Sequence, residues 1–213
     1  MSSYTGFTVS KVDLEKDWNE LMSIFWTSWK TPLQASGELT FPYLGSDTPE
    51  EAVAYGITSA GLLSEAKQNV DNILWYKATE NLTNKIVGGL CLKVERKWPN
   101  SDGQCLFVLL EYRSTGVAKQ LIDSGIIEAD SSGLEVFLEG TTFSTPGLLR
   151  VGFIVIGWVN LVFARRNPSK DWTRLVNELQ SHPISIMWRP RLGRYIEGET
   201  LLPWTGKTRN AKL

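Results

Sequence analysis

Histidine and cysteine are scarce in this chain, which excludes several kinds of active site. The 213 residues include one histidine, His182, and two cysteines, Cys91 and Cys105. A Ser-His-Asp triad and a zinc site both need such residues in sets with characteristic spacing, and no such set occurs. We therefore expect no metal site, and we interpret His182, which precedes Pro183, as a loop residue. Two cysteines outside any CxxC pair are typical of buried thiols in a reducing compartment.

The chain also lacks an excess of charge, long apolar runs and a Walker-type phosphate-binding sequence. Its net charge is −1 and it has no polybasic segment, so nucleic acid and membranes are poor candidates for its main partner. The longest apolar run, residues 151–163, is interrupted by glycine and asparagine and is too short to span a bilayer. No secretory signal opens the sequence. We expect an intracellular protein whose partner is a small molecule.

Tryptophan, by contrast, is abundant, with nine residues in the chain. Three large aromatic side chains, Phe25, Trp26 and Trp29, belong to an apolar stripe with helical spacing, which predicts an amphipathic helix. An irregular apolar segment, residues 32–44, follows this helix and contains Phe41. One interpretation is core packing. The other is that Phe25, Trp26, Trp29 and Phe41 line a substrate pocket for a bulky or aromatic molecule.

The remaining periodicity predicts a single α/β domain over residues 1–190, with a mixed central sheet flanked by helices, and a basic tail over residues 191–213. Thr48-Pro49 followed by Glu51 predicts a capped helix that ends near Gln68. Strands are expected at 7–12, 73–78, 85–94, 106–110, 134–138, 153–163 and 184–188, and further helices after 116, at 148–151 and after 167. The strand-helix-strand run from 106 to 138 predicts a parallel strand pair.

The chain is organised around the turn at its centre, Glu111 to Ala118. This turn follows an apolar strand and leads into a helix that begins near Gly116. The first backbone N–H groups of a helix have no partner inside the helix, and the helix dipole is positive at that end. Gly116 allows a ligand to come close to the backbone, and Ala118 leaves the first turn unobstructed. The turn is therefore predicted to bind a phosphate or pyrophosphate.

In this layout the sequence resembles the GNAT superfamily of acyl-CoA-dependent N-acyltransferases. The motif R-x-x-G-x-A at Arg113 to Ala118 is similar to the family's coenzyme A motif. Leu138-Glu139-Gly140 and the segment 146–153, which ends in Gly-Phe, are similar to its next two landmarks. The layout is similar over residues 7–190, and the motifs cover about 40 residues. Fungal small-molecule members look closest, through the segments 86–89 and 188–190.

The resemblance implies that coenzyme A or acetyl-CoA is the co-substrate. It implies that backbone amides of the turn hold the pyrophosphate and that the pantetheine arm lies along the end of the preceding strand. The cofactor-binding residues implied in this way are Val108, Leu110, Arg113, Ser114, Thr115, Gly116, Val117 and Ala118. An amide near the strand's end would polarise the thioester carbonyl.

Two glutamates are candidates for the catalytic base that the resemblance requires. An amine nucleophile must lose a proton, and Glu139 or Glu111 could accept it directly or through water. The alternative for each is a solvated surface carboxylate. Many relatives place a tyrosine, as general acid for the departing thiolate, where this chain has Leu148. A leucine cannot donate a proton, so either solvent protonates the thiolate or the protein no longer performs acetyl transfer.

Three functions therefore remain open. The first is transfer of an acyl group, most simply acetyl, to a small apolar or aromatic amine. The second is a GNAT-fold enzyme repurposed as a cyclase or isomerase of an apolar secondary metabolite. The third is a non-catalytic module that binds coenzyme A. The C-terminal Ala211-Lys212-Leu213 resembles the type 1 peroxisomal signal, which would make an import receptor a partner and the peroxisome, otherwise the cytoplasm, the location.

Overall fold

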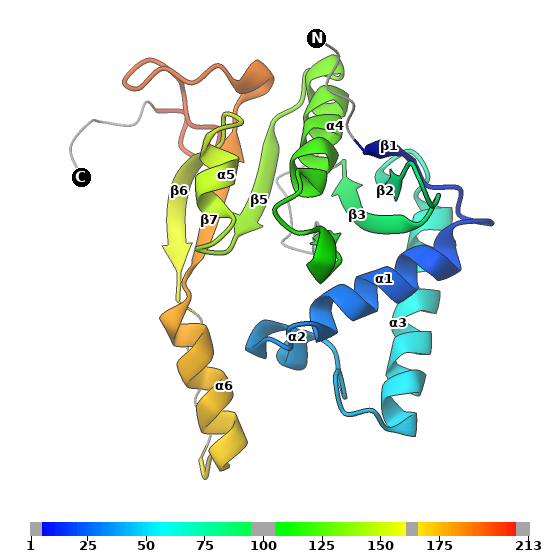
Figure 1. Ribbon diagram of the computed structural model, residues 1–213. Coiled ribbons are helices and arrows are strands. Elements are labelled where there is room, and N and C mark those ends of the chain that lie inside the picture. The colour runs from blue at the N-terminus through cyan, green and yellow to red at the C-terminus, as the bar shows by residue number, and fades with distance from the viewer. Residues whose placement is uncertain (1–5, 95–104, 161–165, 208–213) are drawn as a thin grey trace. The chain divides into compact units, whose positions relative to one another are not determined.

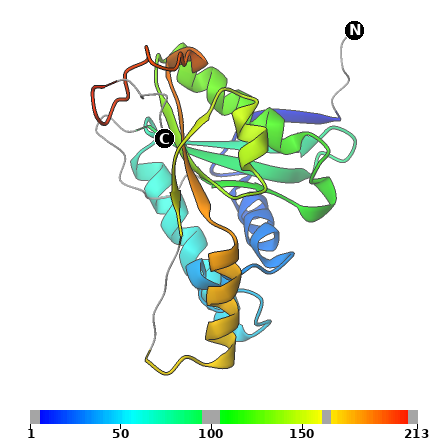
Figure 2. The same ribbon diagram turned by 90° about the vertical axis from the view of Figure 1, so that its left-hand side faces the viewer.

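A computed structural model describes residues 6–94, 105–160 and 166–207 of the chain (Figures 1 and 2). The chain divides into two compact units. The first contains residues 1–125 and 164–179, and the second contains residues 126–163 and 180–213. The predicted peroxisomal signal at 211–213 lies outside the described residues. No helix in the described ranges has both the length and the apolar content needed to cross a membrane.

The first unit is built on a four-stranded antiparallel sheet with the order β1-β2-β3-β4. Its strands are β1 (Phe7–Lys11), β2 (Ile73–Glu80), β3 (Ile86–Lys93) and β4 (Cys105–Val108). The alternation of side chains gives the sheet two apolar faces. Trp75 and Phe107 belong to one apolar cluster, and Tyr76 and Val108 belong to the other. The predicted hairpin of residues 73–94 is confirmed.

Helices cover both faces of this sheet. On one face, α1 (Trp18–Lys30) contacts β3 and β4, and α3 (Pro49–Gln68) contacts β2. On the other face lie the first turns of α4 (Val117–Ser131), whose Val117 and Leu121 are fully buried. The predicted extents of α3 and of the helix after residue 116 are confirmed. The expected α/β fold, with helices flanking a sheet, is therefore present.

The segment 32–44 is not irregular throughout, which corrects the expectation of a long loop. It contains α2 (Ala35–Thr40), and α6 (Lys170–Ser181) supplies the contacts that hold it. The Ala35 N–H donates to Glu178 Oε1 over 2.9 Å, and the Arg174 guanidinium donates to both oxygens of Glu38. These partners lie more than 130 residues apart. Local sequence could not predict α2, because its stabilising contacts are not local.

Helix α3 begins as predicted at Thr48-Pro49, but its glutamate does not complete a capping box. Thr48 makes no side-chain cap bond. Glu51 is buried and accepts hydrogen bonds from the Asp47 N–H at 2.8 Å, from Trp26 Nε1 at 2.9 Å and from Lys30 Nζ at 3.2 Å. Burial opposes ionisation of Glu51, but these donors outweigh burial and lower its pKa to about 2. Glu51 therefore joins the helix start to α1.

The two cysteines of the first unit are free thiols on paired strands. Cys91 on β3 lies opposite Cys105 on β4. A hydrogen bond with Cys91, together with burial, raises the pKa of Cys105 well above the usual value. Cys105 is therefore an uncharged thiol at neutral pH. Cys91 is buried, as the sequence predicts, whereas Cys105 is only partly buried.

The second unit contains a three-stranded antiparallel sheet with the order β5-β7-β6. Its elements are β5 (Val136–Gly140), the short helix α5 (Thr145–Leu149), β6 (Ile154–Val159) and β7 (Ile184–Arg189). The predicted parallel pair is wrong, because every strand pair among the described residues is antiparallel and β5 pairs with β7. The strand beside β5 is β7, which comes late in the chain. Apolar periodicity predicts that a segment is a strand but not which strand it pairs with.

Trp188 on β7 is the centre of the second unit's core. It is 1% exposed, and the rings of Phe137, Tyr195 and Trp204 pack around it. The next residue, Arg189, is also buried and makes two hydrogen bonds with the Asp130 carboxylate, at 2.7 and 3.0 Å. Residues 195 and 204 of the predicted tail thus pack on the core of this unit.

Candidate functional site

The predicted anion-binding turn begins where β4 ends, two residues earlier than expected. The Leu109 N–H donates to the Val87 carbonyl over 3.0 Å, which is the last bond to the neighbouring strand. A short 3-10 turn, Leu110–Tyr112, follows, and Leu110 is 47% exposed. The expectation of a buried strand through Leu110 is corrected accordingly. The chain turns because Tyr112 and Arg113 donate their N–H groups back to the carbonyls of residues 109 and 110.

Two residues of the turn adopt left-handed backbone conformations. Ser114 has φ +65° and Gly116 has φ +96°. A side chain disfavours this conformation, so Ser114 stores some strain, and glycine is the natural residue at 116. Thr115 lies between them, and its hydroxyl donates to the Tyr112 carbonyl over 2.7 Å, which stabilises the turn. Turns of this kind direct successive N–H groups toward a common point, where an anion can bind.

The backbone N–H groups from Ser114 to Ala118 make no hydrogen bond to another described residue. The first bond inside α4 runs from the Gln120 N–H to the Gly116 carbonyl at 3.1 Å. The first turn of α4 contains no acidic side chain. A Cβ at Gly116 would meet no atom within 4 Å, so the space beside the turn is open. The result is a positively polarised helix start with free donors.

Arg113, a predicted cofactor-binding residue, directs its side chain to the protein backbone. Its guanidinium donates to the carbonyls of Val108 at 3.2 Å, Ser28 at 2.9 Å and Thr31 at 3.3 Å. Ser28 belongs to the last turn of α1, where carbonyls lack partners and a cation is favourable. Arg113 therefore fastens the turn to the end of β4 and to α1. The sequence did not reveal this role, because the carbonyls of Ser28 in α1 and of Thr31 just after it are main-chain atoms 85 and 82 residues away.

Tyr112 makes a second attachment between the turn and the sheet. Its hydroxyl donates to Glu80 Oε2 over 3.2 Å, and its ring packs edge-on against Phe7 at a centroid distance of 5.9 Å. Partial burial and the neighbouring charges of Glu80 and Glu111 raise the pKa of Tyr112, so its phenol stays protonated at neutral pH. Tyr112 thus attaches the turn to β1 and β2, and Arg113 attaches it to β4 and α1.

The two candidate catalytic glutamates lie in different units. The Glu111 carboxylate is 60% exposed and lies 3.9 Å from Lys85 Nζ. Glu139 is exposed near the end of β5, opposite Ile186. Neither has the buried, hydrogen-bonded surroundings that Glu51 has. Their catalytic role stays a prediction.

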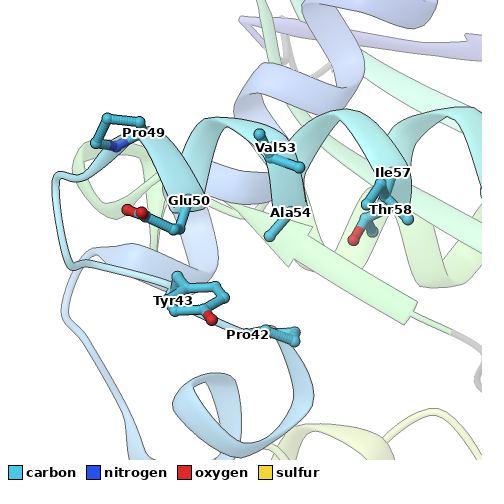
Figure 3. A pocket seen from close by; sticks show the side chains of 8 residues that line it. All are labelled: Pro42, Tyr43, Pro49, Glu50, Val53, Ala54, Ile57 and Thr58. Carbon is cyan, nitrogen blue, oxygen red and sulfur yellow. The ribbon is translucent and has the colours of Figure 1, made fainter.

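The aromatic residues predicted to line a pocket pack against one another instead. Phe25 and Trp26 are 3% and 7% exposed. Ring centroids of Phe41 lie 5.4–5.5 Å from those of Phe25, Trp26 and Trp29. The aromatic stripe of α1 faces the sheet, so core packing is the interpretation that the contacts favour. A cavity of about 460 Å³ lies elsewhere, on the outer side of α3 (Figure 3).

Leu148, at the position where the resemblance calls for tyrosine, is a core residue of the second unit. It is 4% exposed, and its Cδ1 would lie 3.3 Å from a Cβ at Gly140. The polar group buried nearby is a pair of hydroxyls, Thr145 and Ser185, whose oxygens are 2.7 Å apart. The Ser185 hydroxyl also lies 3.0 Å from the Gly140 carbonyl. This pair joins α5 to the sheet and was not predicted.

Comparison with known proteins identifies relatives by fold but not by sequence. No protein-family model matches the chain, and no curated protein matches it. Among solved structures, the ribosomal-protein-S5-alanine acetyltransferase of Vibrio fischeri superposes with a TM-score of 0.58 and 13% identity, over 89% of this chain and 95% of that one. A GNAT-family acetyltransferase of Streptococcus pneumoniae superposes with a TM-score of 0.55 and 16% identity, over 87% of this chain and 99% of that one.

A third structure, the PaiA N-acetyltransferase of Thermoplasma acidophilum in complex with coenzyme A, superposes with a TM-score of 0.51 and 17% identity, over 85% of this chain and 97% of that one. The chain has the fold of the GNAT acetyltransferases. The predicted α/β, GNAT-like fold is thereby confirmed, but the sheets of the described residues are antiparallel and not mixed as expected. At these identities the likeness concerns the fold alone, so the reaction and its substrates are inferred from the site.

Proposed function

We propose that this protein is an acyl-CoA-dependent N-acyltransferase that transfers an acetyl group from acetyl-CoA to an amine. The observation that carries the proposal is the set of free backbone N–H groups from Ser114 to Ala118 at the start of α4. Five consecutive donors without acceptors among the described residues are costly unless water or a ligand satisfies them. A pyrophosphate suits them because it is anionic and accepts several hydrogen bonds at once.

The surroundings of the turn fit coenzyme A in three respects. No acidic side chain occupies the first turn of α4, so no carboxylate of that turn competes with a phosphate for the N–H donors. The space beside Gly116 is open. The fold is shared with an N-acetyltransferase whose structure contains coenzyme A. We assign pyrophosphate binding to the amides of Ser114–Ala118 and the pantetheine arm to the end of β4 and the residues that follow it, Val108 to Leu110. The side chain of Arg113 positions this turn and leaves phosphate binding to the amides.

Acetyl-CoA, when bound, supplies the acyl group as a thioester. Acyl transfer forms a C–N bond, breaks the C–S bond and moves one proton from the amine to the departing thiolate. Glu139 and Glu111 are our candidates for accepting the amine's proton, and their exposure makes transfer through water a suitable route. Leu148 supplies no proton, so we assign protonation of the thiolate to solvent.

For the acceptor we propose a small apolar or aromatic amine, as in the fungal small-molecule enzymes that the sequence resembles. The near-neutral net charge gives no reason to expect a nucleic-acid or strongly acidic protein acceptor. We also propose a peroxisomal location on the basis of Ala211-Lys212-Leu213, where acyl-CoA substrates would be at hand. A fluorescent fusion with and without these three residues tests that location directly.

The first experiment is a thermal shift of the purified chain with acetyl-CoA, compared with free coenzyme A and with buffer. Ligand at about 100 times its Kd adds roughly 2.7 kcal/mol to the free energy of unfolding, which raises Tm by several degrees. No shift at millimolar ligand would contradict the proposal and favour a repurposed fold. Binding without turnover of an amine panel would instead indicate a coenzyme-binding module.

Turnover then tests the glutamates. If Glu139 or Glu111 is the base, Glu139→Gln or Glu111→Gln should lower kcat by about 100-fold or more while leaving acetyl-CoA binding intact. Unchanged kcat in both variants would remove both from the mechanism.

A further inference from the structure

Helix α3 has an inner face that packs on the first unit and an outer face that is apolar and exposed. Its inner face includes Glu51, Ser59, which accepts from Trp18 Nε1, and Ala66. On the outer face, Val53 is 61% exposed and Ile57 is 69% exposed. No charged residue occurs between positions 51 and 65. An exposed apolar strip of this kind is typical of a surface that packs against another protein.

The outer face borders a groove of about 460 Å³ (Figure 3). One wall is the N-terminal half of α3, with Val53, Ala54, Ile57 and Thr58, and the other is formed by Pro42 and Tyr43. Tyr43 is 58% exposed. Its backbone has a left-handed φ of +63°. The groove therefore presents branched aliphatic and aromatic side chains to solvent.

Two glycines in the interior of this helix have no explanation inside the protein. A Cβ at Gly56 or at Gly61 would meet no atom within 4 Å, and neither residue has a positive φ. Glycine in a helix interior lowers helix stability relative to alanine. Its absent side chain is useful where a second backbone must come close. This observation supports an occupant of the groove and does not by itself identify it.

The arrangement of side chains along the face matches its own antiparallel copy. A two-fold axis at the middle of α3 places Ile57 opposite Ala60 and Val53 opposite Ser64, so each large side chain meets a small one. Gly56 and Gly61 lie on the two flanks of this strip, where the absence of a side chain leaves room for the second helix. Such alternation is what helix packing at interaxial distances of 8–10 Å requires.

The charges at the ends of the face are complementary in the same arrangement. Glu50 lies in the first turn and Lys67 in the last, about 26 Å apart along the helix. In the antiparallel pair each Glu50 faces Lys67 of the second copy. Lys67 Nζ lies 2.6 Å from Glu15 Oε1, but the Lys67 side chain is still 45% exposed, so it can interact with a second carboxylate. The antiparallel helix dipoles add to this attraction.

We propose that the outer face of α3 binds a second copy of this chain, forming a two-fold symmetric dimer. The occupant of each groove is the C-terminal half of the other copy's α3, with Ala60, Gly61 and Ser64. A strip of one helix and one loop is a small interface, so we expect a dissociation constant on the order of micromolar. The dimer surface is separate from the coenzyme turn, and the inference does not depend on the proposed reaction.

The test is sedimentation equilibrium of the full chain between about 1 and 500 μM. We expect the mass to rise with concentration from 23.9 kDa to twice that value. Ile57→Arg, which places two like charges near the axis, should weaken the dimer by at least 10-fold. Ile127→Arg is the matched control, because Ile127 is a helical isoleucine that is 68% exposed, and it should have no effect. Circular dichroism checks that both variants are folded.

A charge exchange identifies the geometry. Glu50→Lys and Lys67→Glu should each weaken self-association, and a mixture of the two single variants should associate more tightly than either alone. A chain that is monomeric at all concentrations would overturn the proposal and assign the face to a different protein. A dimer that Ile57→Arg leaves intact, or that Ile127→Arg weakens equally, would also overturn it.

Discussion

The first unit contains two helix starts that treat their free backbone donors in opposite ways. At the start of α3, the first turn carries Glu50 and Glu51, and the Glu51 carboxylate accepts from the N–H of Asp47. At the start of α4, no acidic residue occurs in the first turn, and the N–H groups from Ser114 to Ala118 have no acceptor among the described residues. Both helices are long, with 20 and 15 residues.

The difference indicates which helix start is structural and which is functional. Where a helix start only has to be stable, carboxylates of the same chain can accept hydrogen bonds from its N–H groups and offset the positive end of the helix dipole. A helix start that receives an anion must leave its donors free and its first turn without carboxylates. The N-terminus of α3 meets the first description and that of α4 meets the second. The following changes test this comparison, from the largest expected effect to the smallest.

The largest effect should come from Gly116→Trp. The change forces a bulky residue into a conformation with φ +96° and fills the open space beside the turn. We expect the Kd for acetyl-CoA, measured by calorimetry, to rise by at least about 100-fold. Gly133→Trp is the matched control, because Gly133 also has a positive φ and open surroundings but lies beyond the C-terminal end of α4. Equal losses in both variants would contradict a site at the helix start.

Glu51→Gln should destabilise the protein without affecting coenzyme binding. The variant removes a buried charge that accepts from Trp26, Asp47 and Lys30, so we expect the free energy of unfolding to fall by about 2–3 kcal/mol. Denaturant titration measures this loss. We expect the folded variant to bind acetyl-CoA with the same Kd as the native protein. A large change in that Kd would mean that the two helix starts are coupled.

The same glutamate predicts a pH dependence. Its pKa is lowered in the folded protein to about 2 from an ordinary value of 4.5, so its contribution to stability is complete above pH 4.5. It is lost as the pH falls from 4.5 toward 2. The stability difference between the native protein and Glu51→Gln should therefore shrink over this interval. A difference that stays constant down to pH 2 would show that the lowered pKa is not the source of stability.

Ala118→Asp should make the start of α4 resemble that of α3. A carboxylate in the first turn competes with a bound phosphate for the same donors, and we expect the Kd for acetyl-CoA to rise by about 10-fold. The helix itself should gain a few tenths of a kcal/mol. Ala118→Asn, of similar size but without charge, should change the Kd much less. Equal effects of the two variants would indicate obstruction instead of charge.

Thr48→Ala should have the smallest effect. Loss of an N-cap side chain usually costs about 1 kcal/mol, but the Thr48 hydroxyl makes no cap bond. It lies 3.0 Å from the Ser46 hydroxyl on the surface. We expect less than 0.5 kcal/mol by denaturant titration. A loss of 1 kcal/mol or more would show that Thr48, and not Glu51, stabilises this helix start.

Features set by neighbours along the chain were predictable from the sequence. The limits of α3 and the start of α4 follow from Pro49, Gly116 and apolar periodicity, and the hairpin of β2 and β3 follows from two apolar runs around a polar turn. The turn's left-handed Gly116 was likewise predictable, because glycine tolerates that conformation. Each of these features depends on residues that are close together in the sequence, so the sequence around a feature is enough to predict it.

The tertiary structure decided what depends on distant partners. It placed α2 against α6, inserted β7 beside β5, packed the aromatic stripe of α1 into the core, and directed the Arg113 side chain to the carbonyls of α1. The sequence by itself determined that a helix begins after a glycine turn, and that the first N–H groups of this helix have no partner inside the helix. Whether those donors stay free depends on which side chains the fold brings to them, because a hydrogen bond needs both partners in one place.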